Sequence, residues 1–299
     1  MSRRVLHGAG YWTWRIAAAV AQGLPSAVLY PLAILLGDLA YLTWGAKRRI
    51  AKGNFSVVLG LPVNDPLVAG TARRSFRNFA KYLIEIMRFP KLSPEDFERL
   101  VTIDGWEHLQ RARENGRGVI FVSIHFGNFE LGGARVAAEI PLNVIADDLN
   151  NQRLMDLLIG HRAHKGISIH SPTGAARKVL QALRRNEMVG LMMDLGPRAL
   201  AFENVAARFF GIPTRFPTVA ADLARVSGAP IVVAAVVRQS DNTFRGIALP
   251  PIFVDRREGQ AQRVTEAIAQ HLEGFVRQWP DQWYIFRPMW APETPSPNP

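Results

Sequence analysis

The chain has 299 residues and no cysteine, so it can form a sizeable core but no disulfide, thiolate metal site or acyl-cysteine intermediate. Its formal net charge of +11 predicts an anionic partner such as a phospholipid surface, a phosphorylated substrate or nucleic acid. The basic residues accompany apolar stretches rather than a base-reading helix or an aromatic strand, which favours a membrane over nucleic acid.

Residues 1–53 have the composition of a membrane-associating helical segment. Between Arg15 and Lys47 the only charged residue is Asp38. Basic residues lie on both sides of this apolar stretch, and Lys47, Arg48 and Arg49 would meet anionic headgroups, each contributing about 1 kcal/mol. Aromatic residues mark its two ends, as they do at membrane interfaces: Trp12, Trp14, Tyr41 and Trp44.

Four interpretations of this segment compete. A cleaved signal peptide is disfavoured, because the apolar stretch is long and is followed by basic residues. A single spanning helix over Ile16 to Gly37 is long enough, but Pro25 and Pro31 interrupt it. Two short helices in one leaflet, broken near Pro25, fit better. A helical hairpin of a soluble protein is the remaining alternative. We expect a peripheral or monotopic protein, or one with a single N-terminal anchor.

The body of the chain, residues 54–290, alternates strands and helices, which predicts an α/β domain with a mostly parallel central sheet flanked by helices. An amphipathic stretch over 71–88 precedes this alternation. The proline-rich end, residues 291–299, is predicted to be disordered. In chain order we expect a strand at 100–103, a helix at 106–115, a strand at 119–124, a helix at 128–138, a strand at 142–146, a helix at 152–164, a strand at 167–170, a helix at 174–185, a strand at 188–193, a helix at 218–227, strands at 230–237 and 244–249, and a helix at 258–279.

The strongest functional signal is the run 118–130, where an apolar strand ends at His125, Gly127 turns the chain and Glu130 follows. Ligands of α/β folds bind outside the carboxyl ends of the strands. We predict that Glu130 accepts a hydrogen bond from one ring nitrogen of His125 and that the other nitrogen acts as a general base. The structural alternative is a buried histidine followed by a glutamate that the helix dipole stabilises.

Other polar residues, the Asn128 side chain among them, are predicted to bind substrate. Asp194 ends a second apolar strand, and with Arg198 it could contact an acceptor hydroxyl or phosphate, although a turn-capping aspartate is equally consistent. Asn151 and Arg162 would share one helical face, and Arg162 could bind a phosphate or carboxylate. A solvated arginine is the alternative.

Several familiar chemistries find no support in the sequence. His161, His164 and His170 have no carboxylate at ligand spacing, so we assign no metal. The sequence contains no hydrolase nucleophile elbow, phosphate-binding loop or dinucleotide fingerprint.

Five elements in order resemble the bacterial lysophospholipid acyltransferase-like family, which includes lipid A late acyltransferases and phosphatidylinositol mannoside acyltransferases. The resemblance covers most of the chain through Trp290. One departure is Ala206, which occupies the place of a glutamate that some members carry before the Phe-Phe-Gly element; Asp194 is our candidate for the third acidic position. The elements are His125 to Glu130, Asn151 through Arg162 to Gly166, Leu183 to Arg198, Phe209 to Pro213, and Pro280 to Tyr284.

This resemblance implies transfer of a fatty acyl group from acyl-CoA or acyl carrier protein to a hydroxyl of a membrane glycolipid or phospholipid, at the cytoplasmic face of the inner membrane. No cofactor beyond the thioester co-substrate is implied. Without a cysteine, we expect direct transfer in a ternary complex. The backbone amides around Gly127 and Asn128, at a helix N-terminus, are the expected donors to the thioester oxyanion.

Two other functions fit the same sequence. A catalytically silent lipid-binding or assembly protein would keep its function without His125. A lipid-directed hydrolase would release free fatty acid because water would replace the acceptor.

Overall fold

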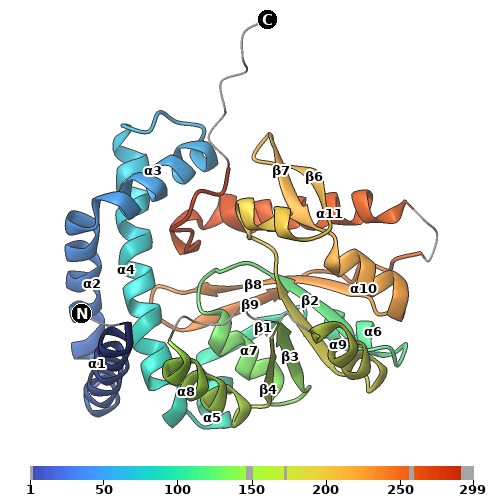
Figure 1. Cartoon of the computed structure of the whole chain (residues 1–299), viewed down its shortest axis with the longest axis horizontal. Helices are drawn as coiled ribbons and strands as arrows, with labels where there is room; N and C mark the ends of the chain where they lie inside the picture. The colour runs from blue at the N-terminus through green and yellow to red at the C-terminus, as the bar shows by residue number, and fades with distance from the viewer. Residues whose placement is uncertain (1–2, 146–150, 172–173, 256–258, 291–299) are drawn as a thin grey trace, which may run out of the picture.

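The computed structural model describes residues 3–145, 151–171, 174–255 and 259–290. Their centre is a seven-stranded sheet in the order β1-β9-β8-β2-β5-β3-β4 (Figure 1). The pairs among β8, β2, β5, β3 and β4 are parallel, whereas β9 runs antiparallel to β8 and carries β1 at the edge. The strands span β1 Val101–Asp104, β2 Val119–Ser123, β3 Leu142–Ile145, β4 Ile167–His170, β5 Met188–Met192, β8 Ile231–Arg238 and β9 Phe244–Ala248.

Helices cover both faces of this sheet because its strands carry apolar side chains on both sides. Val119 and Val232 belong to one core, whereas Ile120 and Val233 belong to the other. This alternation buries all of β8 and all of β2 except the half-buried Phe121, and it is typical of a parallel sheet. One core packs against α5 Pro94–Leu100, α6 Trp106–Arg113 and α7 Phe129–Ala137, and the other against α9 Ala175–Arg184, α10 Val219–Ser227 and α11 Gln260–Gln278. The helix α8 Gln152–Ala163 packs beside β4.

The predicted α/β fold with a mostly parallel sheet is therefore confirmed. The sequence did not predict a separate antiparallel hairpin, β6 Asn204–Phe209 and β7 Ile212–Pro217, which packs against α11. Pro213 and Pro217 argue against a strand in sequence, but an isolated two-stranded hairpin tolerates them.

The N-terminal residues form an angled helical layer at one edge of the molecule (Figure 1). The chain breaks at Pro25, as predicted, and separates α1 Arg3–Gly23 from α2 Ser26–Thr43. The following helices are α3 Gly45–Leu59 and α4 Pro66–Arg88. The predicted segment boundary at residue 53 falls inside α3, and residues 291–299 lie outside the described residues.

Two features of α2 attach it to α4. At Gly37 the helices approach so closely that a Cβ atom would lie 2.6 Å from the Cα of Arg77. One residue later, Asp38 accepts hydrogen bonds of 2.6–2.8 Å from both Arg73 and Arg77. These arginines hold the pKa of Asp38 far below its usual value. The charge inside the apolar segment is thus neutralised by α4.

The face of α2 and of residues 10–24 that points away from α4 is apolar and uncovered. Within the described residues, α2 is the one helix long and apolar enough to cross a membrane, judged by length and composition. Its buried residues form a single stripe, Leu29, Ala33 and Gly37, which faces α4. Among residues 10–44 the exposed large apolar side chains are Trp12, Ile16, Val20, Leu24, Val28, Leu32, Leu35, Leu36, Leu39, Leu42 and Trp44.

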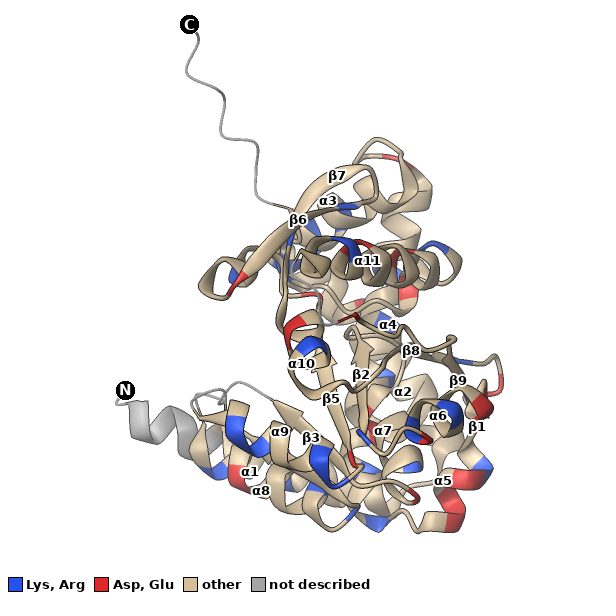
Figure 2. Cartoon of the chain, turned by 90° about the vertical axis from the view of Figure 1, so that its right-hand side faces the viewer, with Lys and Arg blue, Asp and Glu red and all other residues tan. Residues whose placement is uncertain are grey.

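Basic residues elsewhere are dispersed. On the face shown in Figure 2 they lie on α6, α9, α10 and α11 and form no continuous stripe. This distribution differs from the clustered basic face of a typical nucleic-acid-binding domain.

Candidate active site

Two neighbouring strands of the sheet bring His125 and Asp194 together. In the β2–β5 pair Ser123 lies opposite Met192, and both chains continue two residues further in the same direction. The backbone N–H of Met193 still donates to the carbonyl of Ser123 at 2.9 Å, so the register persists beyond the strands. The register therefore places His125 beside Asp194, outside the carboxyl ends of the strands, where α/β folds bind ligands.

The His125 imidazole is held by the Asp194 carboxylate. Nδ1 of His125 lies 2.8 Å from Oδ1 of Asp194, and the His125 backbone N–H donates to Oδ2 at 3.1 Å. The carboxylate side chain is 1% exposed and the imidazole 36%, so the ring alone can meet a substrate. Because an ionised carboxylate only accepts hydrogen bonds, Nδ1 carries the proton and Nε2 is the basic nitrogen.

Electrostatics favour the ionised form of this pair. Burial opposes the charge on Asp194, but His125, Arg287 and Trp283 bring its pKa down to about 2. Burial likewise opposes protonation of His125, yet the Asp194 carboxylate raises the pKa of the imidazole above its ordinary value. The aspartate thus strengthens His125 as a base.

A tight turn after His125 rests on β8. Gly127 has φ +56°, and a Cβ atom there would lie 1.6 Å from the carbonyl oxygen of Val236, so only glycine fits. The Gly127 N–H donates to the carbonyl of Gln282 at 2.9 Å. This hydrogen bond contradicts its predicted role as an oxyanion donor, because the amide already has a buried partner.

The segment that follows α11 completes the support of the pair. Phe126 forms an isolated antiparallel bridge with Trp283, and the Tyr284 N–H donates to the His125 carbonyl at 2.9 Å. The indole Nε1–H of Trp283 donates to Oδ2 of Asp194 at 3.0 Å. The Pro-x-Gln-Trp element of the sequence therefore holds both the histidine turn and the aspartate.

The predicted contact between His125 and Glu130 is wrong, because Asp194 takes that place. Glu130 lies in the first turn of α7 and forms a bidentate ion pair with Arg162 of α8. Its Oε2 accepts from Nε of Arg162 at 2.9 Å. The pair is largely buried, with side chains 9% and 22% exposed. A catalytic role of Glu130 stays a prediction. In this geometry Glu130 would affect the reaction by orienting Arg162.

A largely apolar cavity of about 770 Å³ joins these groups. His125, Glu130 and Arg162 lie in its wall, and α1 contributes Trp14. Side chains from both faces of the sheet line it: Phe121 and Ala234 with α7 on one face, and Val179 and Leu223 on the other. Its volume is within the roughly 300–1,000 Å³ typical of pockets for organic ligands.

The remaining predicted residues have mixed positions. Asp194 is fully buried against His125 and Trp283, so its predicted contact with substrate is wrong. Asn128 is also fully buried: it caps α7 and donates to Glu85, which contradicts substrate binding by its side chain. Asn151 caps α8, and Arg198 lines the cavity.

Sequence reasoning missed two residues at this site. Arg287 lines the cavity and donates through Nη2 to the Asp194 carbonyl at 2.6 Å, and Trp283 holds the aspartate. Neither lies at the end of a predicted strand. Trp283 is the tryptophan of the Pro-x-Gln-Trp element, which carried the family resemblance but no predicted role, and Arg287 lies four residues after that tryptophan. Among the described residues, no three histidine or carboxylate side chains gather closely enough to hold a metal ion.

Comparison with known proteins places the chain among lipid-modifying enzymes. The model of the bacterial lipid A biosynthesis acyltransferase family matches residues 1–291. The chain is 27% identical over 256 residues to a phosphatidylinositol mannoside acyltransferase of Mycobacterium tuberculosis (strain ATCC 25618 / H37Rv), covering 82% of this chain and 78% of the relative. It is 25% identical over 258 residues to the lipid A biosynthesis palmitoleoyltransferase of Escherichia coli (strain K12), covering 84% and 81%. The chain therefore belongs to the bacterial lipid A biosynthesis acyltransferase family.

Proposed function

We propose that this acyltransferase moves a fatty acyl group from a thioester, acyl-CoA or acyl carrier protein, to a hydroxyl of a membrane glycolipid or phospholipid. The observation that carries the proposal is the partly exposed His125, held by the buried Asp194, in the wall of an apolar cavity. An imidazole with a fixed tautomer is the base that an unactivated hydroxyl requires near neutral pH.

The proposed reaction proceeds in one complex of enzyme, donor and acceptor. Nε2 of His125 takes the proton of the acceptor hydroxyl while its oxygen bonds to the thioester carbonyl carbon. The tetrahedral intermediate then collapses, the carbon–sulfur bond breaks, and the imidazolium returns the proton to the leaving thiolate. Asp194 stabilises the imidazolium between the two steps, as its effect on the pKa of His125 requires.

A covalent intermediate would need a nucleophile other than cysteine. The Ser123 hydroxyl is the one to test, because it is buried in the cavity wall two residues before His125. Direct transfer predicts that Ser123→Ala retains activity and that no acyl adduct appears on the intact protein. An adduct that forms in wild type and is absent from Ser123→Ala would replace direct transfer by a two-step route.

The apolar cavity offers a place for the acyl chain, and the N-terminal helices offer a way to the lipid. Trp14 of α1 is part of the cavity wall, so this apolar N-terminal helix lies next to the proposed acyl site. We infer that its uncovered face rests in the cytoplasmic leaflet of the inner membrane, where the thioester donors are available. Deletion of residues 1–45 should then abolish transfer to bilayer-embedded acceptor.

Arg162 and Arg198 are the proposed contacts for anionic groups of donor or acceptor, because both line the cavity. The relatives are named for phosphatidylinositol mannoside and for lipid A. We therefore propose a glycolipid or phospholipid acceptor of this chemical kind. No cofactor beyond the thioester enters the proposed reaction.

Lipid mass spectrometry of membranes that contain wild type or His125→Ala tests the function. We expect one lipid class to lose an acyl chain in the variant. Free fatty acid that accumulates without any acylated lipid would indicate a hydrolase instead. An unchanged lipid profile would support the silent lipid-binding protein and refute the proposal.

A further inference from the structure

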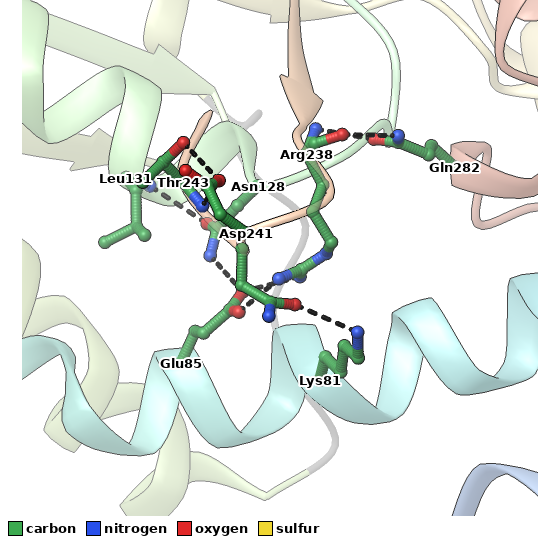
Figure 3. A network of polar contacts seen from close by, with 9 residues as sticks. Lys81, Glu85, Asn128, Leu131, Arg238, Asp241, Thr243 and Gln282 are labelled. Atoms are coloured by element: carbon green, nitrogen blue, oxygen red, sulfur yellow. Dashed lines mark hydrogen bonds and ion pairs between the residues drawn. The ribbon is translucent and has the colours of Figure 1, made fainter. Parts of the chain in front are cut away.

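A buried charged cluster lies beside the catalytic turn and takes no part in the proton transfer. Glu85 of α4 and Arg238 at the end of β8 have side chains 6% and 4% exposed. They form two hydrogen bonds, of 2.5 and 2.8 Å (Figure 3). Since desolvation offsets most of the attraction within such a pair, stability alone is a weak reason for its presence.

Glu85 has another partner that connects it to the active site. The side-chain amide of Asn128 donates through Nδ2 to Oε2 of Glu85 at 2.7 Å. Its Oδ1 accepts from the Leu131 N–H at 3.0 Å and so caps α7. A carboxylate accepts hydrogen bonds but cannot donate them, so Glu85 determines which end of the Asn128 amide faces the helix.

The same cluster holds the turn from its other side. Oε1 of Gln282 accepts from the Arg238 backbone N–H at 2.7 Å, and Nε2 donates to the Arg238 carbonyl at 2.9 Å (Figure 3). The Gln282 carbonyl in turn accepts from the Gly127 N–H. Residues 125–128 are therefore fixed between Gln282 and Glu85.

The helix α2 also lies beside this cluster: Nζ of Lys81 on α4 is 5.5 Å from the centre of the Tyr30 ring, and burial together with the nearby Glu85 carboxylate raises the pKa of the Tyr30 hydroxyl. Glu85 thus lies near the lipid-facing helix α2 and is hydrogen-bonded to β8 and to the residue that caps α7, the helix that carries Glu130. Asn128 lies three residues after His125 and two before Glu130. A rotation of the Asn128 amide would shift the start of α7, and with it the positions of His125 and Glu130 in the cavity wall.

We propose that Glu85 is a positioning residue of the transferase, which acts by holding the Asn128 amide so that the turn presents His125 and α7 presents Glu130 to the cavity. The proposal rests on the proposed function of His125. This role differs from a purely structural one in what it predicts for turnover. The hydrogen-bond acceptor for Asn128 should affect kcat, whereas the charge pair between Glu85 and Arg238 should not.

Two double variants separate these roles. Glu85→Met with Arg238→Met removes both charges together with the acceptor for Asn128. Glu85→Gln with Arg238→Met removes both charges but keeps an acceptor oxygen. Neither touches Gln282, whose contacts with residue 238 are made through the backbone. Both variants avoid an unpaired buried charge, so we expect both to fold; the double methionine variant should melt somewhat lower, because the buried Asn128 amide loses its acceptor.

The expected difference lies in turnover. In the double methionine variant kcat should fall about 10- to 100-fold, since small misplacements of reacting groups have effects of this order. The KM for donor and the pH dependence set by His125 should remain, because His125 and Asp194 are intact. The glutamine variant should recover most of kcat. Equal turnover of the two stable double variants would overturn the proposal.

Asn128→Ser provides the test if either double variant fails to fold. Serine still caps α7, but it is too short to donate to Glu85 while capping. We expect reduced kcat with a normal melting temperature, and wild-type kcat would overturn the proposal. Inactive wild-type protein would instead contradict the proposed function, so the two failures are distinguishable.

Discussion

Replacement of Asp194 by asparagine should remove the base without disturbing the fold. Oδ2 of Asp194 accepts two N–H groups, from the His125 backbone and from Trp283, at 3.1 and 3.0 Å. An asparagine satisfies both donors only if its oxygen takes this position, which turns its NH₂ group toward Nδ1 of His125. Nδ1 must then accept, so the ring proton moves to Nε2. The nitrogen that faces the substrate can no longer take a proton.

We expect kcat for acyl transfer to fall about 10³- to 10⁴-fold in Asp194→Asn, the loss typical of a histidine base held in the wrong tautomer. The pH profile supplies a second measurement. Since the base must be neutral and Asp194 raises the pKa of His125, the wild-type kcat/KM should rise with pH through an apparent pKa above 6.5. In the variant, burial still lowers the pKa of His125, but the carboxylate no longer raises it. Any remaining rise of kcat/KM with pH should therefore occur at lower pH than in wild type.

Glu130→Gln is the matched control, because its carboxylate contacts Arg162 rather than His125. We would measure initial rates of both variants across the pH range in which histidine titrates, and their melting temperatures alongside. The comparison shows which of the two carboxylates supports His125 as the base. The pH limb should remain close to that of wild type in Glu130→Gln. A wild-type rate and limb in Asp194→Asn, together with loss of both in Glu130→Gln, would refute the reasoning.

Three further predictions concern the scaffold. Gly127→Ala should destabilise the protein by at least about 3 kcal/mol, because the new Cβ would clash with the Val236 carbonyl. Gly53→Ala, on the exposed side of α3, is the control and should stabilise the protein by about 0.5–1 kcal/mol. Urea unfolding measures both free energies, and equal stabilities of the two variants would contradict the turn geometry. Arg162→Met should cost about 3 kcal/mol in the same assay, because Glu130 is left buried without its partner, and an unchanged midpoint would mean that the ion pair does not form in solution. Joint replacement of Leu35 and Leu39 by glutamate should weaken binding to anionic liposomes at least tenfold with little change in stability, because both side chains are exposed; undiminished binding would remove α2 from the membrane contact.

The fold was predictable where the apolar pattern is continuous. The runs that became β2, β5 and β8 are buried on both faces, and such runs with turn signals at each end indicate parallel strands. The order of the strands in the sheet was not predicted, because it follows from packing between segments far apart in the sequence. The hairpin β6–β7 escaped prediction because its prolines break the strand pattern.

The site was predicted in its parts but not in its pairing. His125 and Asp194 were each placed at the end of a strand, yet nothing in the sequence states that β2 and β5 are neighbours. Nearness in the sequence favoured Glu130 instead. After the turn at Gly127 the chain enters α7, and the side chain at position 130 faces Arg162 on α8. Chain proximity therefore suggested the wrong carboxylate.

The pairing of β2 with β5 has a consequence for how such an enzyme diversifies. His125 and Asp194 follow adjacent central strands, whereas α7, α8 and α9, which lie between them in the sequence, contribute side chains to the wall of the cavity. Substitutions and insertions in those helices and loops can reshape the cavity while the distance between imidazole and carboxylate stays constant. The pair that holds the proposed base and the helices that shape the proposed lipid site are thus separable parts of one continuous segment, so we expect lipid selectivity to be changeable without loss of the His125–Asp194 pair.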